Sequence, residues 1–236
     1  MKKSILFIGI PLLFNLIFMG LYFSGIESLQ FLMAPEVEGI PASSWREFGI
    51  MEQSQNIFLL CGVFLFSWAT IKRTATLEKV FFGMGTAVLL FLFLEEMDYG
   101  IHLIHYFSNT PLETTRFSWH NQKTFSGHEN ERYLKKIADI AGVICFFILP
   151  LLKDRITSQS IKSIIPSLWF IPLLVISFLV SSLAHFLDDQ GLAVINMATG
   201  GLKNNISEFR ETTTYYIYLM YAFQLVKTVD LKSIQR

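Results

Sequence analysis

The chain has 236 residues, of which 52% are hydrophobic and 16% are charged, and its formal net charge is zero at pH 7. A soluble domain usually has about a quarter of its residues charged. This composition argues against a nucleic-acid partner, which would favour a basic protein, and indicates an integral membrane protein in contact with the lipid bilayer.

The N-terminal segment begins with Lys2 and Lys3, and an apolar run over residues 5–23 follows. The apolar part of a secretion signal is only about 7–15 residues long. Because this run is longer, we interpret it as the first transmembrane helix. A cleaved signal peptide is the alternative.

Apolar blocks of similar length recur along the chain, and a helix needs about 20 residues to cross the hydrocarbon core. Pro166 and Pro172 lie in the fifth block and predict a kink there, which membrane helices tolerate. The predicted fold is an all-α, polytopic transmembrane bundle that forms a single domain over residues 1–236. Its helices, about six in number, are expected at roughly 4–24, 50–71, 80–106, 137–152, 164–187 and 211–228.

The distribution of Lys and Arg predicts the orientation of this bundle. If the N-terminus is cytoplasmic, the inner segments are basic, as at Lys72, Arg73 and Lys153, and most acidic residues are outside. Both termini are then cytoplasmic, and the expected location is the inner (plasma) membrane, crossed several times. The outer segments, roughly 25–49, 107–136 and 188–210, are either interfacial segments on the outer leaflet or ordinary loops that cover the helix ends.

The strongest chemical signal lies in the third predicted helix. Steps of three and four residues connect Glu95, Asp98, His102 and His105, and residues with this spacing share one helix face. Glu95 is about fifteen residues into the helix, or roughly 22 Å from its start, and so lies within the hydrocarbon region. A carboxylate there must be paired, protonated, hydrated or bound to a metal.

Polar residues of other predicted helices lie at the same outer level, and we expect them to converge on one site. Glu52 opens the second helix, Asp139 opens the fourth and Glu208 the sixth. Loop residues His120 and His128 either fold onto this site or are solvated. The candidate catalytic residues are Glu95, Glu96, Asp98 and Glu211, and the candidate metal ligands are His102, His105, His185, Asp188 and Asp189.

Imidazole and carboxylate groups together suit zinc, iron or manganese, and helix bundles build such sites from facing helices. The expected function is therefore a membrane-embedded, metal-dependent hydrolase or transferase that acts on a lipid or lipid-linked substrate at the outer face. Three alternatives remain open. One is a proton- or ion-coupled transporter, and another is haem binding, with His102 or His105 opposite His185. The third is a structural or assembly subunit of an envelope complex.

One part of the sequence resembles a known protein family. Glu95-Glu96-x-Asp98-Tyr99-Gly100, followed by His120-Asn121-Gln122 and His128-x-Asn130, resembles an uncharacterised family of bacterial polytopic membrane proteins. The family pattern is Glu-Glu, two residues, then Trp-Gly-Gln, and this chain has Tyr99 and Ile101 in place of the Trp and the Gln. The resemblance implies a membrane location and brings no activity.

A second, looser similarity is to membrane hydrolases such as the alkaline ceramidases, which use Ser, His and Asp around zinc. Ser181-x-x-x-His185 looks like one of their elements, but their His-x-x-x-His pair is missing here.

Overall fold

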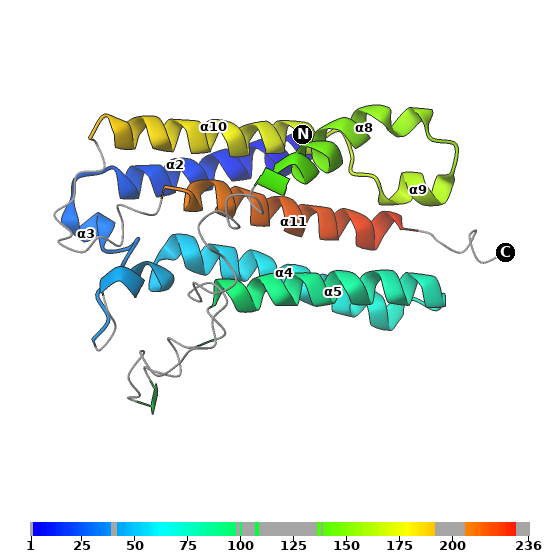
Figure 1. The fold of residues 1–236 in the computed structure, drawn as a ribbon, viewed down its shortest axis with the longest axis horizontal. Coiled ribbons are helices and arrows are strands. Elements are labelled where there is room, and N and C mark those ends of the chain that lie inside the picture. The colour runs from blue at the N-terminus through cyan, green and yellow to red at the C-terminus, as the bar shows by residue number, and fades with distance from the viewer. Residues whose placement is uncertain are drawn as a thin grey trace.

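The computed structural model describes residues 2–38, 42–97, 100, 107–108, 136–137, 139–191 and 206–229, and this part of the chain is helical without a strand (Figure 1). Four helices are long and apolar enough to cross a membrane. They are the N-terminal rod Lys2–Tyr22, α4 (Ile50–Lys72), α5 (Thr76–Glu96) and α10 (Phe170–Asp189). The predicted all-α fold is therefore confirmed, with four helices long and apolar enough to span a membrane, whereas the count of six and the cytoplasmic position of both termini remain predictions.

The N-terminal rod consists of α1 (Lys2–Ser4), the π turn η1 (Ile5–Gly9) and α2 (Ile10–Tyr22). A second π turn, η5 (Ile144–Ile148), precedes α8 (Leu149–Leu152), in the segment that is helical over 139–152. Each π turn ends two residues before a proline, Pro11 or Pro150. Proline lacks an N–H and crowds the carbonyl four residues earlier, and the wider π turn relieves this contact without ending the helix.

Two helices have bounds in the structure that differ from those predicted from the sequence. The helix predicted over 80–106 ends at Glu96, where Met97 leaves the helix and Gly100 has a φ of +75°. That backbone conformation belongs to the left-handed region and cannot continue a right-handed helix. The helix face proposed for Glu95, Asp98, His102 and His105 is thus interrupted, and the last three residues lie outside the described residues.

The helix predicted over 164–187 begins later, as α10, and Ile164 is instead the last residue of a separate helix, α9 (Gln159–Ile164). Ile165 is extended (φ −66°, ψ 133°), as a residue before proline prefers, so Pro166 separates two helices instead of kinking one. Pro172 lies in the first turn of α10, where a missing N–H costs nothing.

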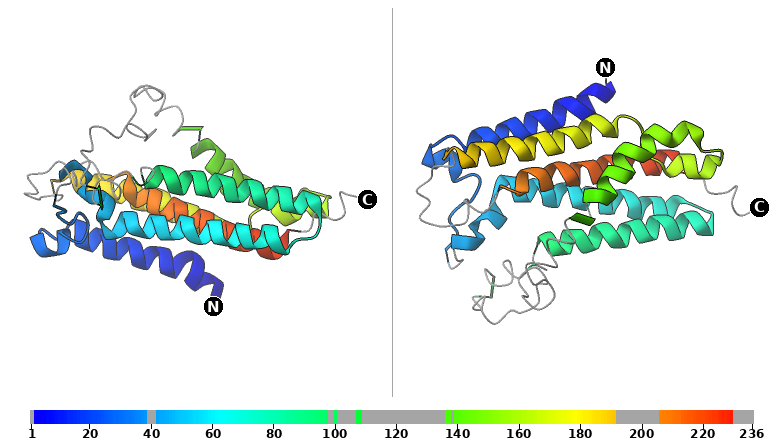
Figure 2. Two further views of the ribbon diagram at one scale, coloured as in Figure 1. Left: turned by 90° about the horizontal axis from the view of Figure 1, so that it is seen from below. Right: turned by 45° about the horizontal axis from the view of Figure 1, so that its top comes forward.

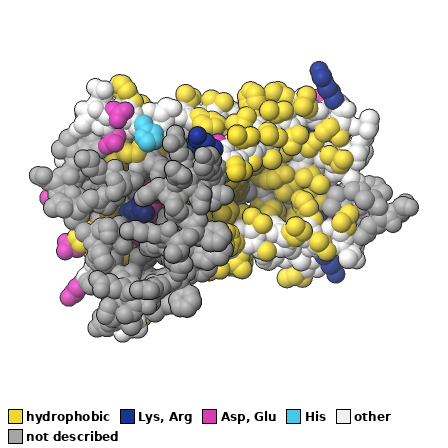
Figure 3. All heavy atoms as spheres, viewed as in Figure 1, with side chains coloured by type: hydrophobic (Ala, Val, Ile, Leu, Met, Phe, Trp, Pro, Cys, Tyr) yellow, Lys and Arg dark blue, Asp and Glu magenta, His cyan; other side chains and the backbone are white. Residues whose placement is uncertain are grey.

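The last helix, α11 (Glu208–Thr228), is the centre of the bundle although it is not apolar enough to count among the spanning helices. It lies between the α4–α5 hairpin on one side and α2 and α10 on the other (Figures 1 and 2). The surrounding helices shield its polar side chains, which is the usual position of polar residues in a membrane bundle. Figure 3 shows apolar side chains over much of the described outer surface, as contact with lipid requires.

Arg73 connects the helices at the end of the bundle that contains the α4–α5 turn. Its guanidinium donates hydrogen bonds to the carbonyl oxygens of Val226 (2.7 Å) and Val229 (2.9 Å), which are orphan acceptors at the end of α11. It also lies 3.5 Å from a carboxylate oxygen of the fully buried Glu78. One side chain thus ties the α4–α5 turn to α11.

Close packing between α4 and α5 depends on glycine. A Cβ atom built on Gly85 would lie 2.7 Å from two ring atoms of Phe66, and this ring is buried against Phe82. Only hydrogen fits at that position without moving the ring. The close approach also sets the position of the last turn of α5, which carries Glu95 and Glu96.

We expect Gly85→Ala to destabilise the protein by about 1–3 kcal/mol, because the added methyl group overpacks the α4–α5 contact. Gly83→Ala is the matched control on the same helix, since its Cβ would meet nothing closer than 4.0 Å. It should be neutral or stabilising by about 0.5–1 kcal/mol, because alanine favours a helix more than glycine does. Thermal melts in detergent measure both, and equal melting temperatures for the two variants would contradict this packing argument.

Candidate functional site

An acidic pocket lies at the end of the bundle opposite the α4–α5 turn. Helices α4 and α11 begin there, α5 ends there, and the short 3-10 helix η2 (Ala42–Phe48) leads into α4. Six glutamates and one arginine line this pocket: Arg46, Glu47, Glu52, Glu95, Glu96, Glu208 and Glu211.

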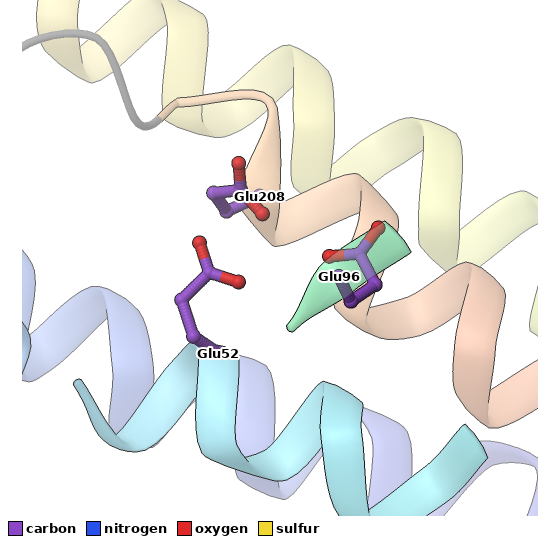
Figure 4. A group of neighbouring side chains, drawn as sticks. All are labelled: Glu52, Glu96 and Glu208. Carbon is purple, nitrogen blue, oxygen red and sulfur yellow. The ribbon is translucent and has the colours of Figure 1, made fainter. Parts of the chain in front are cut away.

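Three of these glutamates form a tight group, which we call the carboxylate trio: Glu52 of α4, Glu96 of α5 and Glu208 of α11. One carboxylate oxygen from each lies within 4.8 Å of the others, and the side chains point toward one another (Figure 4). Glu52 is 3% exposed and Glu208 is 7% exposed, while Glu96 is partly buried. Since each member comes from a different helix, the trio exists only because the three helices pack together.

Neutral donors from neighbouring helices hold two members of the trio. The Gln55 side-chain amide on α4 donates to Oε2 of Glu208 (3.0 Å) and also to Oγ1 of Thr212 (3.0 Å). The Tyr215 hydroxyl on α11 donates to Oε1 of Glu96. Both contacts cross between helices, so they fix the positions of carboxylates that would otherwise repel one another.

Arg46 is the only lining cation among the described residues of the pocket. Its Nε lies 3.1 Å from Glu47, and its Nη1 lies 3.9 Å from Glu208. Burial lowers the pKa of the Arg46 guanidinium, but the neighbouring carboxylates, first Glu47 and then Glu208, outweigh this effect. The pKa of Arg46 is therefore raised above its ordinary value, and the group stays charged.

The described lining of the pocket thus contains six carboxyl groups and one guanidinium. Ionised carboxylates in a largely buried position are costly unless protons or cations compensate them. Two amide oxygens on the next turn of α4 after Glu52 also lack partners. Oε1 of Gln55 and Oδ1 of Asn56 are buried, and neither has a donor within the described part of the chain. Buried acceptors of this kind normally bind water or an ion.

The structure brings some of the predicted site residues to this pocket and leaves others elsewhere. Glu95, Glu96 and Glu211 line it, as do Glu52 and Glu208. The residues predicted at the end of α10 do not line it. His185 and Asp189 are exposed, and Asp188 is partly buried.

The position of His185 has a simple geometric reason. The buried face of α10 includes Ser177, Val180 and Ala184, and His185 comes one residue after this face. Asp139 forms an ion pair with Arg210 and does not line the pocket either. Asp98, His102, His105, His120 and His128 lie outside the described residues, so their roles stay predictions.

Arg46 and Glu47 were not predicted as site residues, because the sequence of η2 was interpreted as part of a loop. The signal available was a charged pair a few residues before the start of α4. A Cβ on Gly49 would lie 1.8 Å from the carbonyl oxygen of Met33, so glycine is required for the chain to pass there. This close passage brings η2 over the pocket.

No match to this chain is found among protein-family models, curated proteins or solved structures. The geometry of the acidic pocket is therefore the basis for any functional argument. Two buried glutamates, one in the pocket and one at the other end of the bundle, allow a direct test of whether the pocket is a strained site or a satisfied structural network.

We expect Glu52→Gln to raise the free energy of unfolding of metal-free protein at pH 8 by an amount on the order of 1 kcal/mol, which a higher melting temperature would show. Two like charges about 5 Å apart repel by roughly 3 kcal/mol at an effective dielectric constant of about 20, and the substitution relieves part of this repulsion. Glu78→Gln should lower the melting temperature, because Glu78 lies beside Arg73. If both variants melt lower by similar amounts, the trio is a structural hydrogen-bond network.

Proposed function

We propose that this protein is a membrane-embedded hydrolase or transferase that depends on a divalent cation and acts on a lipid or lipid-linked substrate at the pocket end of the bundle. The observation that carries the proposal is the carboxylate trio, in which three helices each direct a glutamate to one point. Gln55 and Tyr215 support it, since hydrogen bonds that orient metal-binding carboxylates are a regular part of such sites.

The chemistry of the donors favours a hard cation. The trio offers carboxylate oxygens as ligands, and oxygen ligands of this kind suit Mg²⁺, Mn²⁺ or Ca²⁺. Manganese also belongs to the set of Zn, Fe and Mn that the sequence suggested. A bound cation would polarise a substrate oxygen or lower the pKa of a bound water molecule.

The location of the pocket favours an enzyme over a carrier. The acidic residues of the pocket lie where helices begin and end. At the opposite end of the bundle, the described charged pair is Arg73 with Glu78, and Arg73 also donates hydrogen bonds to carbonyl oxygens of α11. A lipid headgroup reaches such a position without crossing the bilayer. Arg46 would bind the anionic part of a headgroup, because a guanidinium pairs well with phosphate or carboxylate.

An ion-coupled transporter is the second candidate, and one observation favours it. Polar contacts continue from the pocket into the bundle: Gln55 contacts Thr212, and the fully buried Asn15 of α2 donates to Oγ1 of Thr213 (2.9 Å). Oδ1 of Asn15 has no donor among the described residues. Intramembrane polar groups of this kind often mark ion pathways. Cation flux into proteoliposomes distinguishes the carrier from the enzyme.

Metal binding is the direct test of the proposal. Purified protein in lipid nanodiscs, stripped with EDTA, should bind Mn²⁺ stoichiometrically, as measured by electron paramagnetic resonance of free Mn²⁺ and by calorimetry. Glu52→Gln, Glu96→Gln and Glu208→Gln should each weaken binding by at least about tenfold. Glu36→Gln, an exposed glutamate in the segment that precedes η2, is the matched control and should bind like wild type. Wild-type protein that binds no Mn²⁺, Mg²⁺ or Ca²⁺ would overturn the proposal.

We also propose that both termini are cytoplasmic and that the acidic pocket faces outward from the inner membrane. The α4–α5 turn, α9 and the end of α11 lie together at the end away from the pocket (Figure 1). Basic residues concentrate there, including Arg73, Lys153, Lys162 and Lys227. The preference of Lys and Arg for cytoplasmic segments supports this orientation.

Reporter fusions test this topology. Fusions at Thr76 and Thr157 should report a cytoplasmic position, whereas a fusion at Glu38 should report an external one. An external reading for a fusion at the C-terminus would contradict both the orientation and the even number of spans.

A further inference from the structure

A short segment between α2 and η2 presents large apolar side chains where the spanning helices have already ended. Ile26 is 53% exposed, Leu29 36%, Phe31 46% and Leu32 46%. These residues belong to a turn of helix, α3 (Glu27–Gln30), and to the residues that flank it. We call residues 26–32 the interfacial turn.

The backbone of the interfacial turn aligns three of these side chains. The N–H of Leu29 donates to the carbonyl of Ile26 (3.0 Å), and the N–H of Leu32 donates to the carbonyl of Leu29 (3.2 Å). Hydrogen bonds between residues three apart place side chains three apart one above the other. Ile26, Leu29 and Leu32 therefore form one apolar edge, and Phe31 lies beside it.

The opposite side of the turn is fixed to the bundle. Gln30 is fully buried, and its side-chain amide donates to the carbonyl oxygen of Tyr22 (2.9 Å) at the end of α2. Met33 and Ala34 are buried in the same cluster as Tyr22. Gly25, with a φ of +66°, lets the chain leave α2 and turn across its end. The interfacial turn is thus anchored to the end of α2 on one side and exposes its apolar edge on the other.

We infer that the interfacial turn inserts its apolar edge into the lipid leaflet at the pocket end of the bundle. The preceding helix α2 also exposes large apolar side chains, with Leu13 and Leu16 60% and 65% exposed. The only charged residue of the turn is Glu27, and no Lys or Arg occurs between it and Arg46. Apolar burial therefore drives the insertion, and attraction to anionic headgroups does not contribute.

This insertion has a consequence for the acidic pocket. The N–H of Ile50, the first residue of α4, donates to the carbonyl oxygen of Leu32 (2.9 Å). Glu52 follows within the same turn of α4. The interfacial turn therefore fixes the depth of the pocket at the level of the lipid headgroups, independently of what the pocket binds.

Spin labels test the inference in full-length protein that carries Cys61→Ala and Cys145→Ala. Nitroxides attached at Leu29→Cys and at Leu32→Cys, in phosphatidylcholine vesicles, should collide more with oxygen than with a water-soluble nickel chelate. A nitroxide at Glu36→Cys, on an exposed residue of the same segment, is the matched control and should show the reverse. Replacing a third of the lipid by phosphatidylglycerol should leave the three results unchanged.

Two outcomes would overturn the inference. Greater collision with the nickel chelate at both Leu29 and Leu32 would place the turn in water. Poor collision with both reagents would show that protein covers the apolar edge, whether from this chain or a second copy. Neither outcome bears on metal binding, which the Mn²⁺ experiment measures separately.

Discussion

The bundle depends on shielding one polar helix from lipid. Helix α11 carries Glu208, Thr212, Thr213, Tyr215 and Tyr216 as buried residues, and a helix with this sequence is costly against hydrocarbon. Its polar groups instead form hydrogen bonds to the other helices. Tyr216 donates to the carbonyl of Leu6 in the N-terminal rod (2.8 Å), and Tyr221 donates to the carbonyl of Ile164 in α9 (2.7 Å). The less polar helices are arranged around α11 so that these bonds are made.

The same arrangement produces the acidic pocket. Once α11 is central, its first turn brings Glu208 and Glu211 next to the ends of α4 and α5, which carry glutamates of their own. Apolar packing further along the bundle, at Phe66, Phe82 and Leu225, holds the helices together despite the repulsion among these carboxylates. Hydrophobic burial along the bundle thus supports a pocket in which buried carboxyl groups lie close together.

The sequence predicted the main features of this fold because long apolar blocks and the position of acidic residues are strong local signals. Glu95 and Glu96 were identified in this way, since they lie at the end of an apolar helix, and Glu211 was identified from its position in the acidic first turn of α11. The interruption after Glu96 was not predicted, because a periodic pattern does not reveal that Gly100 adopts a positive φ. The orientation of His185 was not predicted either. The end of α10 is apolar on several sides, so residue spacing alone does not define which side of the helix faces the bundle.

Arg73 and the acidic pocket lie at opposite ends of the same three helices, and the two ends are held by different kinds of group. At one end a single guanidinium binds two carbonyl oxygens of α11 and approaches a buried carboxylate. At the other end the neutral side chains of Gln55 and Tyr215 donate hydrogen bonds to carboxylates of the neighbouring helices. The α4–α5 hairpin is thus attached to α11 by a cation at one end and by neutral donors at the other.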